Sequence, residues 1–266
     1  MEISELTKKI IEELLKEGRR FDGRKLNELR EVKIETDISK NAEGSAKVKI
    51  GDTEVVVGVK LNVGEPYPDS QDAGTMMVAA ELSPLASENF ESGPPQIEAI
   101  ELARLVDRAI RESEYIDFKK LCVRKGELVW NVFIDIYPMN VDGNLIDAST
   151  LAAVIALSRA VFPVLEDDKV KYGELTTKKL PLNNAPITIT SYKINNSFIL
   201  DPTTAEEESS SCRISVALTS QKEIKIHALQ KSGYDALTEE EIDEVVSLAV
   251  NEHKKLYNMC SQFFKK

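Results

Sequence analysis

The order of the predicted elements constrains the fold most strongly, because a group of strands followed by a helix occurs twice along the chain. In the first stretch, residues 46–50 and 53–59 alternate in polarity around Gly51-Asp52, which predicts a β-hairpin. After Pro94-Pro95, apolar residues recur at helical spacing across 102–110, so one face of this helix must pack inward. The other predicted elements of this stretch are strands at 32–34, 76–82 and 128–137 and an apolar helix at about 148–162.

From residue 183 onward the same order returns. Asn195-Asn196 closes a second predicted hairpin, much as Gly51-Asp52 closes the first. The predicted elements are strands at 187–194, 197–200, 214–219 and 224–228 and a helix at about 239–263. Two similar halves of this kind predict an α+β fold with mixed or antiparallel sheets and packed helices. We expect an N-terminal helix and basic segment at 1–30, a first half at 31–165 and a second half at 183–266, in one compact unit.

Charge and hydropathy exclude several classes of protein. The formal net charge is -11 and 30% of the residues are charged, so this is no generally basic nucleic-acid binder and any contact with a nucleic acid must be local. No run of about 18 apolar residues is present, and the charged, amphipathic N-terminus lacks the apolar region of a signal peptide. We therefore expect a cytoplasmic protein without membrane contact, whose three scattered cysteines are reduced thiols.

Arg104, Arg108 and Arg111 form an arginine stripe beside the apolar face of the helix after Pro94-Pro95, since they stand at positions i, i+4 and i+7. Arginine binds phosphate through a fixed fork of donors, so the stripe could bind phosphate groups. Spacing alone favours ordinary surface pairing instead, with Glu101 beside Arg104 and Asp107 beside Arg111.

The run from Asp201 to Glu208 places several carboxylates at the end of a predicted strand. Such a cluster could bind Mg²⁺ or supply an acid or base, but the sequence favours a solvated acidic loop. The serines and cysteine at 209–212 are not interpreted as nucleophiles, because nothing near His227 or His253 marks either histidine as a base.

Two further segments are predicted to form turns. After the turn at Asp142-Gly143-Asn144, Asp147 is placed to cap the following helix. A capping Asp would occupy the free N–H groups that otherwise attract phosphate to a helix start. Residues 18–24 are basic and turn-forming, and here the sequence favours a flexible linker after the first helix.

Taken together, these segments resemble the RNase PH-type phosphorolytic exoribonucleases, and in particular the non-catalytic ring subunits of the archaeal exosome. The basic segment 18–24, followed by Glu28 and Arg30, is similar to the opening signature of that family. The other matching segments are 81–86, 93–95, 101–113, 134–137, 142–149 and 201–207. They occur in order through nearly the whole chain, which makes the resemblance highly specific.

The resemblance implies an RNase PH fold, of the ribosomal protein S5 domain 2-like type, and a heterohexameric ring built as a trimer of heterodimers. Three copies of the non-catalytic subunit would alternate with three copies of a catalytic RNase PH-like partner, below RNA-binding cap subunits. Single-stranded RNA would enter a central channel and be shortened from its 3′ end by inorganic phosphate. The resemblance also implies that Arg104 and Arg108, and after them Arg111, contact RNA phosphates in any sequence. No cofactor or metal is expected.

Two departures from the active pattern imply that this chain has no catalytic residues. Active members carry a Gly-Thr-Arg-like phosphate-binding element after the Asp-Gly turn, where this chain has Asn144 to Asp147. They also carry two essential aspartates, where this chain has Glu207 and Arg213. An arginine cannot act as a general acid or bind a metal. We therefore predict no phosphorolysis by the chain alone, because stabilisation of the transferring phosphoryl group is the main contribution in such chemistry.

Three alternatives stay open on the sequence. The chain could be an active homohexameric enzyme, against which the residues at 144–147 and 213 speak. It could be a structural ring spacer without RNA contact. It could also be an unrelated metal enzyme that uses Glu206, Glu207 and Glu208.

Overall fold

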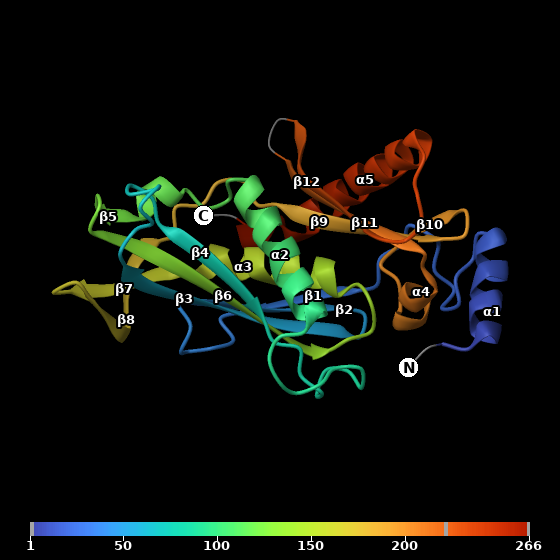
Figure 1. Ribbon diagram of the computed structural model, residues 1–266, viewed down its shortest axis with the longest axis horizontal. Coiled ribbons are helices and arrows are strands. Elements are labelled where there is room, and N and C mark those ends of the chain that lie inside the picture. Colours follow the sequence, from blue (N-terminus) through green and yellow to red (C-terminus); the bar gives the residue numbers. More distant parts are fainter. Residues whose placement is uncertain (1–2, 221–222, 265–266) are drawn as a thin grey trace.

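The computed structural model describes residues 3–220 and 223–264, which form two sheets, a separate hairpin and five α-helices (Figure 1). In chain order the elements are α1 (Glu5–Lys16), β1 (Val32–Thr36), β2 (Gly44–Ile50), β3 (Thr53–Gly64), β4 (Thr75–Ala80), α2 (Ile97–Glu112), a 3-10 helix (Phe118–Leu121), β5 (Cys122–Arg124), β6 (Leu128–Asn140), α3 (Leu145–Arg159), β7 (Val161–Glu166), β8 (Lys169–Lys179), β9 (Ile187–Ile194), β10 (Ser197–Leu200), α4 (Thr204–Ser209), β11 (Cys212–Ser220), β12 (Ile224–Gly233) and α5 (Glu239–Phe264).

The two sheets confirm the predicted α+β fold with mixed and antiparallel pairing. The first sheet has the order β1-β2-β3-β6-β4, with β5 beside β6, and the second has the order β10-β9-β11-β12. Strand β4 runs parallel to β6, and the other described pairs are antiparallel. The hairpin predicted at Gly51-Asp52 joins β2 to β3, and the one predicted at Asn195-Asn196 joins β9 to β10.

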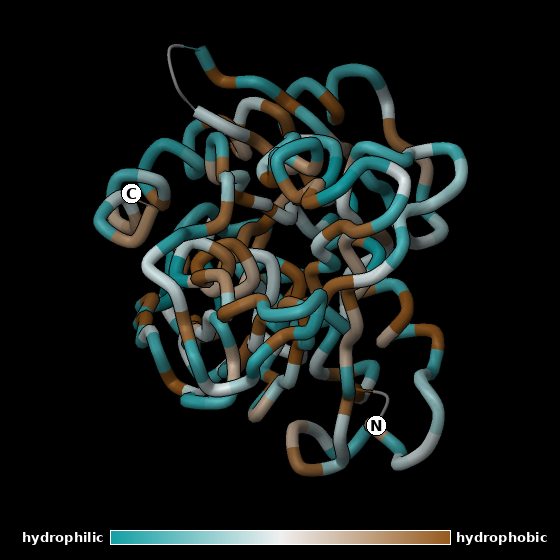
Figure 2. Tube along the Cα trace, turned by 90° about the vertical axis from the view of Figure 1, so that its left-hand side faces the viewer, coloured by the Kyte–Doolittle hydropathy of each residue, from teal (hydrophilic) through white to brown (hydrophobic). Residues whose placement is uncertain are grey.

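The first sheet is apolar on the face that meets the core. In β3 the side chains of Val55, Val57, Val59 and Leu61 are fully buried, while the residues between them are only partly covered. This alternation is typical of a strand with one face on the core. Figure 2 shows hydrophobic segments passing through the middle of the molecule, with hydrophilic turns on its outside.

Helix α3 lies at the centre and joins the two halves. Every residue from 146 to 157 is buried, because α3 contacts β2 and β3 on one side and β9 and α5 on the other. A helix that is apolar on all sides is stable only inside a core. Helix α2 packs on β4 and α3, and α5 covers β9 and β11 of the second sheet (Figure 1). One continuous apolar core therefore runs through both halves. The domain bounds at 30, 165 and 183 stay a prediction.

The prediction of a helix at 148–162 is wrong at both ends. Helix α3 begins at Leu145 and ends at Arg159, after which the chain forms β7. Pro163 explains the end, because a proline disfavours the helical conformation of the residue before it, here Phe162. The hairpin of β7 and β8 was not predicted, since most side chains of β8 are exposed and carry no apolar alternation.

Two further observations concern the chain as a whole. Among the described residues, no helix combines the length and apolar character needed to cross a membrane. The three cysteines, Cys122, Cys212 and Cys260, are free.

Candidate functional site

The start of α3 meets the segment after β10, which brings the two acidic candidate segments, 142–147 and 201–207, into contact. Gly143 packs so closely here that a Cβ atom would lie 2.3 Å from the carbonyl oxygen of Pro202. Gly143 has a φ of 74° and Asn144 a φ of 54°, so the turn into α3 is left-handed at both residues. Glycine adopts this conformation without steric cost, and it alone leaves room for Pro202.

Glu207 provides a carboxylate at this helix start. Its Oε2 accepts the backbone N–H of Asn144 at 3.0 Å, and its Oε1 accepts the hydroxyl of Tyr192 at 3.1 Å. Burial raises the pKa of Glu207, although both hydrogen bonds and the charge of Arg213 act in the other direction. A donor at the start of α3, where a phosphate would bind, is therefore occupied by an acidic side chain of the protein itself.

Asp147 does not cap α3, contrary to the prediction. The helix begins at Leu145, directly after Asn144, so Asp147 lies within its first turn. The carboxylate points into the protein, where it accepts the backbone N–H of Thr190 at 3.0 Å and the Thr190 hydroxyl at 2.7 Å. Burial raises the pKa of Asp147 to about 7, although its hydrogen bonds with Thr190 lower it. Asp147 therefore ties α3 to β9 instead of occupying the donors of the helix start.

Arg213 lies in β11, where the family resemblance places a carboxylate in active members. Its Nη2 forms an ion pair with Oε2 of Glu101 in α2 at 2.7 Å. The prediction that Glu101 pairs with Arg104 is therefore wrong. The ion pair joins α2 to the second sheet and places a fixed positive charge where the active pattern requires a proton-transferring or metal-binding group.

The N-terminal arginines hold the acidic run in place. Arg20 and Glu206 form an ion pair whose side chains are 0% and 1% exposed. Arg24 and Arg30 both contact Asp201, at 3.0 and 2.7 Å. The expected flexible linker at 18–24 and the expected solvated loop at 201–208 are both wrong. Buried charges persist only when they are paired, so these two segments fold against each other.

The carboxylates of the acidic run serve different partners. Glu206 also closes the capping box of α4 with Thr203, whereas Glu207 faces Asn144 and Tyr192. In the part of the chain that the structure describes, no three His, Cys, Asp or Glu side chains are grouped so that they could hold a metal ion.

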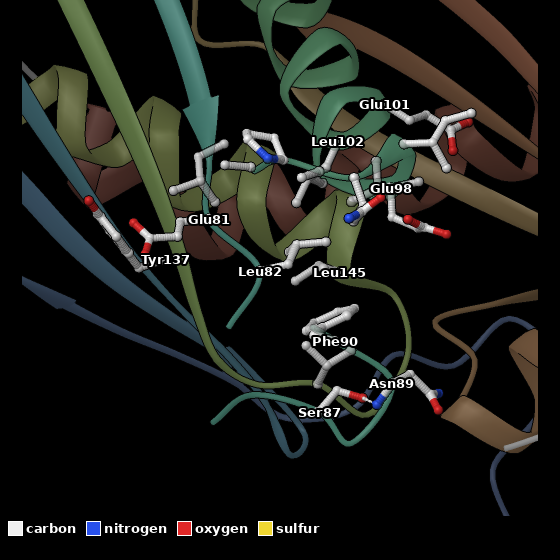
Figure 3. A pocket seen from close by; sticks show the side chains of 18 of the residues that line it. Glu81, Leu82, Ser87, Asn89, Phe90, Glu98, Glu101, Leu102, Tyr137 and Leu145 are labelled. Atoms are coloured by element: carbon white, nitrogen blue, oxygen red, sulfur yellow. Dashed lines mark hydrogen bonds between the residues drawn. The ribbon is translucent and has the colours of Figure 1, made fainter. Parts of the chain in front are cut away.

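A cleft of about 970 Å³, here called the acidic cleft, opens beside Glu207 between α2 and the segment after β4 (Figure 3). Besides Glu207, its acidic lining residues are Glu81, Glu91, Glu98, Glu101, Asp135 and Glu208. Arg213 is the one cation among the described residues that line it. Burial and the nearby Glu81 both raise the pKa of Asp135. So much negative charge repels phosphate and RNA, whereas phosphorolysis needs positive groups around the phosphate.

The arginine stripe lies on the exposed side of α2. Arg111 donates two hydrogen bonds to Asp107, at 2.7 and 3.0 Å, which confirms the predicted surface pairing at this position. Arg108 donates to Gln230 of β12 at 3.2 Å. Within residues 3–220 and 223–264, Arg104 and Arg108 form no ion pair. RNA binding by the stripe stays a prediction.

Sequence reasoning missed Thr190 and Tyr192 as site residues. Both lie in β9, whose strand was predicted, and both point their hydroxyl groups toward carboxylates of the site. Strand periodicity predicts which face a residue occupies, but gives no signal for its polar partner. The partners of Arg20 and Arg213 were missed for the same reason, since Glu206 and Glu101 are far away in the sequence.

Comparisons with known proteins agree over nearly the whole chain. The family described as "3' exoribonuclease family" matches with its domain 1 over residues 28–163 and its domain 2 over residues 184–252. The chain is 46% identical to the exosome complex component Rrp42 of Methanocella arvoryzae, over 93% of this chain and 92% of that protein. It is 46% identical to the Rrp42 of Archaeoglobus fulgidus, over 91% of each chain.

Solved structures give the same result for the fold. A chain from the Archaeoglobus fulgidus exosome, solved with RNA bound to the active site, is 41% identical and has a TM-score of 0.87, covering 96% of this chain and 97% of that one. Rice Rrp46, at 18% identity over 92% of this chain and 100% of that one, has a TM-score of 0.70 and is similar in fold alone.

Proposed function

Because this chain belongs to the 3′ exoribonuclease family, among the archaeal exosome components called Rrp42, we propose that it is a non-catalytic ring subunit of an exosome. Such a complex degrades RNA from its 3′ end. One observation carries the catalytic part of this proposal: the carboxylate of Glu207 accepts the N–H of Asn144 at the helix start where a phosphate would bind.

Electrostatics support the loss of catalysis. Phosphorolysis brings an inorganic phosphate next to the phosphate backbone of RNA, so the site must stabilise additional negative charge in the transition state. At the start of α3 this chain instead offers Glu207 and a cleft lined by carboxylates. Arg213 is bound to Glu101 and replaces a group that would have to transfer a proton. The alternative of an active homohexamer is therefore not favoured.

The proposed partner is a catalytic RNase PH-like subunit that alternates with this chain in a trimer of heterodimers, with RNA-binding cap subunits on the ring. The similarity to a chain of an archaeal exosome core supports this arrangement. A cytoplasmic location belongs to the same proposal. This chain would complete the ring around the partner's active site, while the partner supplies the reacting groups.

Contact with single-stranded RNA is assigned to the arginine stripe. Arg104 and Arg108 are exposed on α2 and free of ion pairs among the described residues, so each can bind a backbone phosphate without breaking an ion pair, although Arg108 would exchange its hydrogen bond with Gln230 for the phosphate. Arg111 would contribute less, because Asp107 already holds its guanidinium group. A purely structural spacer is the alternative, and it predicts no change in RNA affinity when these arginines are removed.

The decisive experiment measures phosphate-dependent shortening of a labelled oligoadenylate. It compares the chain alone, the catalytic RNase PH-like subunit of the same organism alone, and their mixture, each with and without inorganic phosphate. We expect no shortening by this chain alone and more shortening by the mixture than by the partner alone. Phosphate-dependent activity of this chain alone would contradict the proposal.

A further inference from the structure

The acidic cleft has an apolar interior that the proposed function does not use. Figure 3 shows Leu82 and Phe90, which belong to the segment between β4 and α2, close to Leu145 at the start of α3. At the edge of the cleft, Ile97 is 76% exposed and Tyr137 is 43% exposed. Exposed large apolar side chains around a cleft are typical of a binding surface.

The wall of the cleft is a built part of the fold. The segment between β4 and α2 begins where the N–H of Glu81 donates to the carbonyl of Ile136 at 2.9 Å. Further along, the carbonyl of Ala86 accepts the N–H of Val141 at 3.0 Å. Both bonds attach the segment to β6 or its end, so the cleft exists before anything binds. Binding of a ligand would therefore cost less conformational entropy, because the wall of the cleft is already ordered.

The charge of the cleft determines what could fill it. In the described part of the chain, Glu81, Glu98 and Asp135 form no ion pair, and Arg213 is already bound to Glu101. Glu98 lies on α2 and Glu81 on the opposite wall (Figure 3), so negative charge lies on two sides of the apolar interior. An occupant must therefore combine positive groups at its edges with apolar groups between them.

We propose that the acidic cleft docks a segment of a partner protein in which arginine or lysine alternates with large apolar residues. The apolar side chains would fill the space lined by Leu82, Phe90 and Leu145, and the cationic groups would meet Glu81 and Glu98. Arginine beside an apolar anchor is a common source of binding energy at protein interfaces. RNA is excluded by its phosphates. This inference does not depend on RNA contact by the arginine stripe.

The test uses the full chain and a short fluorescent peptide in which arginine and leucine alternate, with binding followed by fluorescence anisotropy. A peptide with glutamate in place of arginine and a labelled oligoadenylate serve as the other probes. We expect binding of the arginine peptide alone. The double variant Glu81→Gln/Glu98→Gln should weaken it about tenfold, because each exposed ion pair contributes up to a few-fold in affinity. Phe90→Ala should weaken it as well, through loss of apolar contact.

The control variant Glu12→Gln/Glu13→Gln removes the same charge from α1, outside the cleft, and should leave peptide affinity unchanged. Melting temperatures of all variants show that each is folded. The inference is overturned if the peptide does not bind, if the control variant weakens binding as much as the cleft variant, or if Phe90→Ala has no effect. It is also overturned if oligoadenylate displaces the peptide.

Discussion

The backbone N–H of Asn144 donates a 3.0 Å hydrogen bond to Oε2 of Glu207. The donor therefore belongs to the first half of the chain, and the carboxylate that accepts from it belongs to the second half. The contact has two consequences for the site. It stabilises the left-handed turn into α3, because the donor would otherwise be unpaired in a largely buried position. It also keeps other anions from this helix start.

Restoring a single carboxylate should therefore not restore catalysis. We expect Arg213→Asp to leave the chain alone inactive, because Glu207 still occupies the N–H of Asn144. The substitution also breaks the ion pair with Glu101 and adds negative charge to the acidic cleft. The measurement is the release of nucleoside diphosphate from an oligoadenylate in the presence of phosphate. Turnover by this variant would show that Arg213 alone silences the site.

Removing the free arginines of the stripe should weaken RNA binding without changing sequence preference. For Arg104→Ala/Arg108→Ala in the assembled complex, the slope of log K against log salt should fall by about 1.4 for each copy of this chain that contacts the strand, since each lost phosphate contact on a single strand removes about 0.7. Affinity for all RNAs should fall alike. Arg111→Ala is the matched comparison and should change little, because Asp107 already holds this side chain. Equal affinities for the double variant and the native complex would support the structural spacer.

The buried ion pair of Arg20 and Glu206 should contribute strongly to stability. Arg20→Met leaves Glu206 buried without its cation, which typically costs about 3–5 kcal/mol in the free energy of unfolding. The measurement is urea unfolding followed by circular dichroism. Arg19→Met is the control at the neighbouring position, since Arg19 is exposed and pairs with Glu17 at the surface. Similar unfolding midpoints for the two variants would contradict the prediction.

Asp147 should make stability depend on pH near neutrality. Its pKa is raised to about 7 in the folded protein, above the value in the unfolded chain. The folded state then keeps a proton that the unfolded state has lost, so this contribution to stability is present in acid and is lost as the pH rises through 7. Asp147→Asn should remove that loss. Relative to the native chain, the variant should gain about 3 kcal/mol between pH 5 and pH 8.

Urea unfolding of both proteins across this pH range checks the prediction. Comparing the two proteins at each pH cancels the titration of all other groups. The same stability difference at every pH would show that Asp147 is ionised throughout.

Periodicity predicted most of the fold, because the signals were local. The strands of both hairpins and the helix after Pro94-Pro95 lie where polarity patterns placed them. The predicted end of α3 was too late because the apolar run continues past Arg159 to Phe162. No residue within this run marks the point at which the helix ends and β7 begins. The exposed strand β8 was missed because it packs few side chains and therefore needs no apolar pattern.

The site was harder to predict, since its interactions connect distant parts of the chain. The family pattern identified Glu207 and Arg213 as departures, but not their partners Asn144 and Glu101. Local rules assigned Asp147 as a helix cap because such a residue near a helix start usually accepts backbone donors. The nearby Thr190 of β9 competed for this carboxylate, and no local rule includes a strand that comes later in the chain.

The pairing of Arg20 with Glu206 also has a consequence for synthesis. The two residues are 186 positions apart, so Arg20 leaves the ribosome long before its partner is made. Until then the N-terminal segment has no buried place to occupy. The first sheet can form around its own hairpins, but the segment must wait for β10 and α4. Contacts between such distant residues slow folding, so closure of the N-terminal segment over the second half cannot precede the synthesis of β10 and α4.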